Sequence, residues 1–170
     1  MTETLTLYKL IILYMLKKVD FPLTTSQISE FILDKGYTTY FKLQGALSEM
    51  LDSELLRVES THNRTLYHLT ENGDETIQYF KNKISPAIQK DINDFLKEKQ
   101  YDLKEEAAVK ADYYLNTNHE YEIRCQITEN GFSLIDLKLT VPTEVEAETI
   151  VNHWTRKSQD VYASILAQLL

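Results

Sequence analysis

Apolar residues in the first third of the chain recur every three or four positions, which predicts helices with one buried side. The first predicted helix, residues 6–18, has this stripe at Leu7, Leu10, Ile11, Tyr14 and Met15. The second begins at Thr24, where Gln27 stands at capping-box spacing, and ends at Gly36, a residue suited to a helix C-terminus. Between the two helices, residues 20–23 form a short extended stretch.

A third helix follows after one residue, a spacing typical of helix-turn-helix proteins. It covers residues 37–51, and its buried side consists of Leu43, Ala46, Leu47, Met50 and Leu51. The opposite side carries Thr38, Phe41, Lys42, Gly45, Ser48, Glu49 and Asp52. Acidic residues occur only in the C-terminal half of this outward side, so only the first two turns suit a phosphate-rich partner.

The period then changes from helical to alternating. Residues 55–70, "LLRVESTHNRTLYHLT", alternate around the polar tip "ESTHNRT", which predicts a β-hairpin with Asn63 and Arg64 at its tip. Thr70 caps a fourth helix. Three helices, a hairpin and a further helix follow one another in the order of a winged-helix domain.

The second half predicts a connecting helix and a small sheet. Ser85 and Pro86 begin the helix as cap and first helical residue. Alternating residues predict strands at 107–115 and 121–128, and the turn Asn130–Gly131 leads into a third strand at 132–141. A last, long helix starts after Thr143, and its apolar stripe is Ala147, Ile150, Val151, Trp154, Val161, Ile165 and Leu169.

These elements predict an α+β fold: an N-terminal winged helix-turn-helix followed by a three-stranded antiparallel sheet with a long C-terminal helix. The predicted parts are a winged helix-turn-helix domain at 1–84, the connecting helix at 85–103, and the sheet plus C-terminal helix at 104–170. Such a small sheet has exposed edges, and dimerisation would cover one of them. We therefore expect a homodimer, with the last part serving dimerisation or sensing.

Charge and composition narrow the choice of function. The net charge is −8, yet residues 1–90 hold ten Lys and Arg against eleven Asp and Glu, and residues 91–170 hold eight against fifteen. The acidity that opposes DNA binding is thus concentrated in the second half. The one cysteine, Cys125, is expected to be buried and fits a reducing, cytoplasmic location. The apolar run near the N-terminus is too short to span a bilayer, so no membrane association is expected.

The sequence offers no motif for catalysis. The four histidines lack metal-ligand spacing, the cysteine has no CxxC partner, and there is no glycine-rich phosphate loop and no GxSxG turn. We expect no enzyme, no metal and no cofactor. Tyr113, Tyr114, Tyr121 and Trp154 would suit a small-molecule pocket, but their positions on periodic stripes favour core packing. The sequence is silent on a small-molecule effector.

The segments "FPLTTSQISEFILDKGYTTYFKLQGALSEML", "STHNRTLYHLTENG" and "ISPAIQKDI" resemble those of an uncharacterised bacterial family, a domain of unknown function with a winged-helix N-terminus. The resemblance runs over almost the whole chain and includes "ADYY" and "IDLKLTVPT". It implies a transcriptional regulator and supplies no established ligand or operator.

The leading hypothesis is therefore a regulator that binds double-stranded DNA through its third helix and wing. The candidate contact residues are Thr25, Ser26, Thr38, Thr39, Phe41, Lys42, Gly45, Asn63 and Arg64. The alternative is a winged-helix module that binds a protein, with Phe41 and the acidic Glu49 and Asp52 facing the partner.

Overall fold

The computed structural model describes residues 6–170 and divides them into two compact units. The first unit contains residues up to Ser60 and Arg64–Leu103, and the second contains Thr61–Asn63 and Lys104–Leu170. Each unit has its own cluster of buried apolar side chains. The fold is α+β with two three-stranded antiparallel sheets. The sequence predicts the α+β class and the sheet of the second unit, whereas in the first unit it predicts only a two-stranded hairpin.

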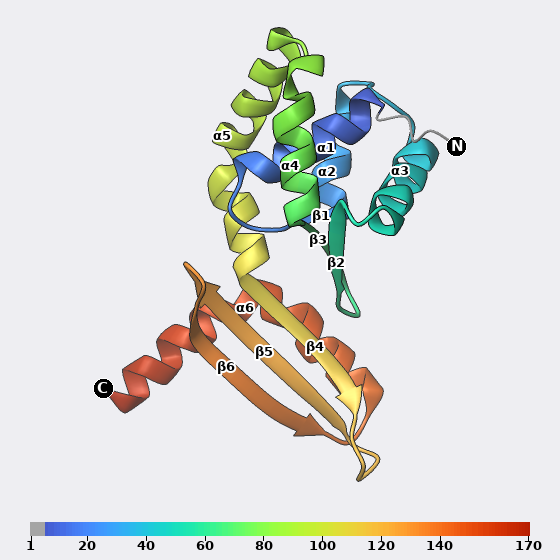
Figure 1. Cartoon of the computed structure of the whole chain (residues 1–170). Coiled ribbons are helices and arrows are strands. Elements are labelled where there is room, and N and C mark those ends of the chain that lie inside the picture. The colour runs from blue at the N-terminus through green and yellow to red at the C-terminus, as the bar shows by residue number, and fades with distance from the viewer. Residues whose placement is uncertain (1–5) are drawn as a thin grey trace. The chain divides into compact units, whose positions relative to one another are not determined.

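The first unit combines helices with the smaller of the two sheets (Figure 1). Its elements in chain order are α1 (Leu7–Lys18), β1 (Leu23–Thr24), α2 (Thr25–Asp34), α3 (Tyr40–Asp52), β2 (Leu56–Ser60), β3 (Thr65–Leu69), α4 (Glu71–Phe80), the 3-10 helix η1 (Lys81–Lys83) and most of α5 (Pro86–Ala108). The strands are ordered β1-β3-β2, so the predicted hairpin is extended by β1. The predicted extended stretch before α2 thus contributes a two-residue strand to this sheet.

Caps fix the ends of α2 and the start of α3. Thr24 and Gln27 form the predicted capping box. At the other end Gly36 has a φ of +71°, and the amides of Gly36 and Tyr37 donate to the carbonyls of Leu33 and Ile32. This αL termination of the helix is easiest for glycine, which has no Cβ. It turns the chain directly into α3.

Helix α1 lies at the centre of the first unit rather than on its surface. It contacts α3, α4, β3 and η1. Because it is covered on several sides, its buried residues extend beyond the single predicted stripe and run without interruption from Lys9 to Leu16. The packed core therefore needs α1, and the lysine inside it needs an acidic partner.

Helix α5 is longer than predicted. The expected helix ended at residue 103 and a strand was expected from 107, but α5 continues to Ala108 and β4 begins at Val109. Residues 105–108 are Glu, Glu, Ala and Ala, all strong helix formers. Their helix propensity outweighs the alternating pattern of Ala107, Val109 and Ala111.

The second unit is a three-stranded meander covered by one helix. Its strands β4 (Val109–Leu115), β5 (Tyr121–Glu129) and β6 (Phe132–Val141) are neighbours in that order, and α6 (Glu144–Leu169) follows them. Asn130 and Gly131 both have positive φ, 50° and 82°, as a type I′ hairpin turn requires. This confirms the turn predicted from the Asn-Gly pair.

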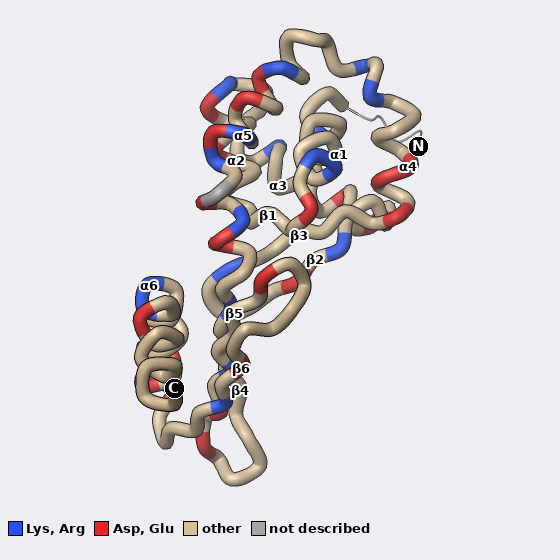
Figure 2. The backbone as a smooth tube through the Cα atoms, turned by 90° about the vertical axis from the view of Figure 1, so that its left-hand side faces the viewer, with Lys and Arg blue, Asp and Glu red and all other residues tan. Residues whose placement is uncertain are grey.

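Helix α6 covers one face of the sheet (Figures 1 and 2). On this face β5 contributes Ile123, Cys125 and Ile127, and α6 contributes Ala147, Val151 and Trp154. The indole Nε1 of Trp154 donates to the carbonyl of Gln126 at 3.1 Å, so the tryptophan is a satisfied core residue. Burial raises the pKa of the Cys125 thiol to about 11, which leaves it unreactive.

Candidate nucleic-acid interface

Helix α3 is oriented by its buried side. Leu43, Ala46, Leu47 and Met50 are buried, and Leu51 is half-buried. Thr39 caps the helix, its hydroxyl oxygen accepting from the amide of Lys42 at 3.3 Å. The predicted buried stripe is confirmed, and it directs the other side of α3 to the surface of the first unit.

Two aromatic side chains dominate the outward side of α3. Phe41 is 87% exposed and Tyr40 is 61% exposed. Lys42 and Gly45 are exposed beside them, and a Cβ added at Gly45 would have no neighbour within 4 Å. The first turn of α3 contains no acidic residue. The N-terminal half of the outward side of α3 is therefore an exposed surface that combines apolar groups with one positive charge.

The C-terminal half of the same side is acidic but partly engaged. Glu49 forms an ion pair with Lys9, whose side chain is only 4% exposed in the core of the first unit. The carboxylate therefore neutralises a buried lysine. Sequence reasoning treated Glu49 as a surface charge, because its partner lies 40 residues away. Asp52 is exposed, one turn further on.

The predicted hydroxyl contacts differ in their accessibility. Ser26 is exposed in the first turn of α2, while Thr25 is half-buried beside it. The hydroxyl oxygen of Thr38 is buried and has no hydrogen-bond partner within residues 6–170. The hydroxyl of Thr39 is occupied as the helix cap. Among the four, Ser26 is thus the one best placed to meet a ligand through its side chain.

The hairpin brings one cation that sequence reasoning missed. Arg57 is exposed on β2, paired across the ladder with His68 of β3. Its position between the apolar residues Leu56 and Val58 of a predicted strand is the signal that marks an outward side chain. The predicted Arg64 is half-buried at the start of the returning strand, and Asn63 is exposed. The hydroxyl of Thr61 donates to Asn63 Oδ1 at 2.9 Å.

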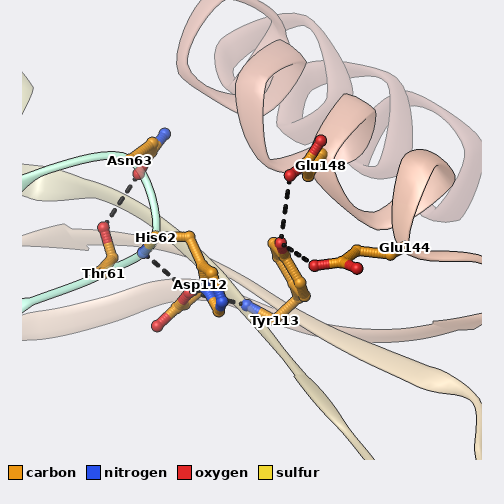
Figure 3. A network of polar contacts seen from close by, with 7 residues as sticks. All are labelled: Thr61, His62, Asn63, Asp112, Tyr113, Glu144 and Glu148. Carbon is orange, nitrogen blue, oxygen red and sulfur yellow. Dashed lines mark hydrogen bonds and ion pairs between the residues drawn. The ribbon is translucent and has the colours of Figure 1, made fainter.

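Thr61–Asn63 belong to the second unit and take part in a polar network there (Figure 3). The amide of His62 donates to Asp112 Oδ1 at 3.1 Å, and the imidazole Nδ1 contacts the same oxygen. The imidazole also stacks on Tyr113, with ring centroids 3.8 Å apart and planes 12° apart. The Tyr113 hydroxyl donates to Glu144 at 3.1 Å.

Burial and the hydrogen bond to Glu144 raise the pKa of Tyr113 to about 12, so this phenol stays protonated. Tyr113 therefore donates to a carboxylate at one end and supports the His62 ring with its face. Sequence reasoning placed Tyr113 on a buried stripe but missed the stacking partner, 50 positions or more away in the chain. Tyr114, by contrast, is 49% exposed on the other face of the sheet.

A family model described as "Domain of unknown function (DUF4364)" matches residues 8–169. The chain belongs to this family. No curated protein and no solved structure matches it. The DUF4364 match covers both units and every candidate residue from Thr25 to Arg64, so the resemblance found in the sequence segments is confirmed at the level of the family.

The first unit of this DUF4364 chain also has an open hollow beside the α3 surface. It has a volume of about 770 Å³ and lies between the end of α3, strand β2 and the start of α4. Three acids, Glu54, Glu71 and Glu75, line it against the single base Arg57. This acidic lining makes the hollow a poor site for a phosphate group.

Two further features, a cluster of metal ligands and a helix able to span a membrane, are absent from the part of the chain that the structure describes. Between residues 6 and 170 there is no group of three or more His, Cys, Asp or Glu side chains arranged to hold a metal ion. Within the same residues, no helix has the length and apolar character needed to cross a membrane.

Proposed function

We propose that this chain is a cytoplasmic, DNA-binding transcriptional regulator whose N-terminal unit is a winged helix-turn-helix. The order of α1, β1, α2, α3 and the hairpin β2–β3 supports this proposal. The observation that carries it is the outward, N-terminal half of α3, where two exposed aromatics, one lysine and an exposed glycine lie together with no acid in the first turn.

The proposed docking mode places α3 in the major groove with its N-terminal end leading. Lys42 would meet a guanine edge or a phosphate, and the ring of Phe41 would contact a thymine methyl group. Gly45 would allow the helix backbone to approach the groove wall closely, since no side chain stands between. Asp52 follows almost three turns after Lys42, away from the leading end.

The remaining contacts would hold the phosphate backbone. The first turn of α2, with Thr25 and Ser26, would present free backbone amides to a phosphate. At the entry of α3 the hydroxyl of Thr39 already caps the helix and that of Thr38 is buried, so these two residues would add little. On the hairpin, Asn63, Arg64 and the exposed Arg57 would follow the backbone or the minor groove.

Electrostatics set the expected strength of binding. The candidate surface has few cations, and on α5 basic and acidic residues alternate, so this helix adds no basic surface (Figure 2). Each neutralised phosphate contributes about −0.9 to the slope of log affinity against log salt. With Lys42, Arg57 and Arg64 engaged, a slope of about −3 per chain follows, together with modest affinity.

The proposal is tested by titrating the full-length protein into duplexes selected from a randomised pool, at about 50 and 200 mM salt. A selected duplex should bind more tightly than a shuffled one, and its affinity should fall with the shallow slope given above. If selection enriches no sequence and no duplex binds at low salt, the proposal is wrong.

A protein partner is the second candidate, favoured by one observation. Phe41 is 87% exposed and its neighbour in sequence, Tyr40, is 61% exposed, and aromatic residues are enriched at protein interfaces. In this alternative the same surface binds a protein, and mutation of Phe41 abolishes that complex without any effect of salt or duplex DNA.

A further inference from the structure

Strand β6 is the outer strand of its sheet and leaves one edge unpaired within the described chain. None of its ten residues is buried. Ile135, Leu137 and Leu139 pair with Ile127, Cys125 and Ile123 of β5, so they point to the face that α6 covers. They are nevertheless only half-buried or exposed, with Leu139 at 42%. An apolar row therefore lies along this edge with an incomplete cover.

Helix α6 is longer than the sheet needs. Its 26 residues extend for about 39 Å, whereas three strands span only about 10 Å between their outer axes. Its C-terminal end lies beyond the β6 edge (Figure 1). No residue after Ser158 is buried, and Leu166 and Leu169 are 38% and 79% exposed. The projecting end is thus also apolar and uncovered.

The sequence of β6 reads symmetrically around Leu137. Ile135 and Leu139 stand two positions to either side, and Asp136 and Lys138 stand one position to either side. In an antiparallel pair with a twofold axis through Leu137, Asp136 lies opposite Lys138 of the second copy, and Lys138 lies opposite Asp136 of that copy. Opposite charges in these positions stabilise a strand pair.

We propose that two copies of this chain pair through β6, antiparallel and centred on Leu137, so that their sheets join into one sheet of six strands. The occupant of the exposed edge is therefore a second copy of the same chain. This inference goes beyond the proposed DNA binding, because the strand pairing uses only the second unit and holds whether or not the first unit binds DNA.

Charges on the open face of the sheet extend the complementarity. Within one copy Arg124 holds Asp136 with two hydrogen bonds, at 3.0 and 2.7 Å, and Lys138 pairs with Glu122 at 3.2 Å. Across the proposed junction the signs therefore alternate in one row, from Arg124 through Asp136 to Lys138 of the second copy and on to its Glu122. This row follows the ion pairs and not the ladder, in which Arg124 stands directly opposite Lys138 of the same copy.

The other face gains apolar cover. A twofold axis perpendicular to the sheet keeps both α6 helices on the same face. Ile135 of each copy then lies opposite Leu139 of the other, and Leu137 lies opposite itself. The end of α6 that projects past its own β6 reaches over the second copy's sheet, where Leu166 and Leu169 would be covered.

The opposite edge, β4, suits self-pairing less well. It has seven residues where β6 has ten. Its Lys110 and Asp112 could in principle pair across a twofold axis in the same way, but the side chain of Asp112 is already held by the amide and imidazole of His62. This edge provides a matched control.

The experiment reverses one charge at a time in the full-length protein and measures its mass by sedimentation over a range of concentrations. Asp136→Lys places two lysines opposite two lysines, and Lys138→Asp places two acids opposite two acids. Each variant alone should dissociate at least about tenfold more readily than the parent. An equimolar mixture of the two should restore the dimer, because opposite charges then meet again.

Lys110→Asp makes the same charge reversal on β4 and should leave the dimer intact. A monomeric parent overturns the proposal, as does a parent dimer that survives both reversals on β6. A mixture that fails to recover the dimer while both variants keep the parent's melting temperature also overturns it.

A crosslink tests the register independently, and it keeps the charges of the parent. Cys125 must first be replaced by Ala, because it lies directly opposite Leu137 within the same chain. In that background Leu137→Cys should form a disulfide between two copies on mild oxidation, since opposite Cα atoms in an antiparallel pair lie within disulfide range. Ile135→Cys alone should crosslink poorly but should crosslink with Leu139→Cys. Efficient self-crosslinking at 135 and not at 137 would contradict the proposed centre.

Discussion

The two units bury their apolar side chains to different degrees. In the first, every residue of α1 from Lys9 to Leu16 is buried, and Phe31 lies under Tyr37 and Phe95. In the second, α6 buries only Ala147, Val151, Trp154 and Ser158 along 26 residues. The first core is closed by its own chain, whereas the second leaves apolar surface at one edge.

This difference indicates what each unit exposes. The first unit exposes two aromatics where α3 begins, beside a lysine and a glycine, and a third, Tyr79, near the end of α4. The α3 surface suits a polar ligand met by a few side chains. The second unit exposes a row of aliphatic residues beside free backbone groups, which suits continuation of the sheet. The two surfaces therefore fit different classes of partner.

The largest expected difference between the two units is in the effect of replacing one phenylalanine in each. Phe31 is 1% exposed, and Phe31→Ala should lower the free energy of unfolding by about 3–5 kcal/mol. Phe132 is 75% exposed, and Phe132→Ala should change it by less than about 0.5 kcal/mol. Urea unfolding of both variants measures this. Equal losses would mean that the second unit is packed as tightly as the first.

Two helical glycines of the first unit separate its core from its exposed surface. A Cβ at Gly73 would lie 2.2 Å from the carbonyl oxygen of Leu55, so Gly73→Ala should cost at least about 2 kcal/mol of stability. Gly45→Ala meets open space and should stabilise α3 by up to about 1 kcal/mol. The same Gly45 variant should weaken DNA binding if α3 approaches a groove closely. Thermal melting and duplex titration report the two effects separately.

The two acids near the end of α3 differ in their contact with the core, since Glu49 pairs with a buried lysine and Asp52 is exposed. Glu49→Gln removes a partner from the buried Lys9 and should cost about 1 kcal/mol, since the carboxylate itself is 56% exposed. Asp52→Asn, its matched control on the exposed side, should be close to neutral. Unfolding midpoints in urea distinguish the two, and a neutral Glu49→Gln would show that Lys9 is satisfied without this pair.

The smallest expected effect is a pH dependence in the second unit. Burial raises the pKa of Asp112, but hydrogen bonds from His62 and from the Tyr113 amide lower it more, so its pKa lies below the ordinary value. A carboxylate with a lowered folded-state pKa stabilises the fold above its unfolded pKa, and this contribution is lost as the pH falls through the folded one.

Asp112→Asn should therefore reduce the loss of stability as the pH falls below about 4, the unfolded-state pKa of an aspartate. Unfolding midpoints of the parent and the variant in that range provide the measurement. If the unfolding midpoints of parent and variant fall equally at acidic pH, Asp112 does not contribute to the pH dependence.

Local patterns predicted much of the fold. The capping box at Thr24, the turn at Asn130–Gly131 and the buried side of α3 each depend on residues a few positions apart, and each is present in the structure. The stretch before α2 was predicted to be extended, but its pairing with β3 as strand β1 was not, because two residues are too few to show a period. The predicted start of β4 was wrong, because at residues 107 and 108 the alternating pattern favoured a strand whereas the helix propensity of alanine favoured a helix.

The candidate site was less predictable, because its environment depends on contacts distant in sequence. The pairing of Lys9 with Glu49 and the stacking of His62 on Tyr113 join residues 40 or more positions apart. A single sequence contains no signal for such pairs. The exposure of Phe41, by contrast, followed from helical periodicity alone, and the structure places it as predicted.

Binding of a selected duplex by Lys42→Glu tests the central claim most directly. Lys42 is the only basic residue of α3 and lies on its exposed N-terminal half. Lys83→Glu, the same reversal on the exposed η1, is the matched control. Fluorescence anisotropy with the parent's selected duplex should show that Lys42→Glu loses specific binding at an unchanged melting temperature, while Lys83→Glu binds like the parent. If Lys42→Glu binds that duplex as tightly as the parent, α3 does not read DNA.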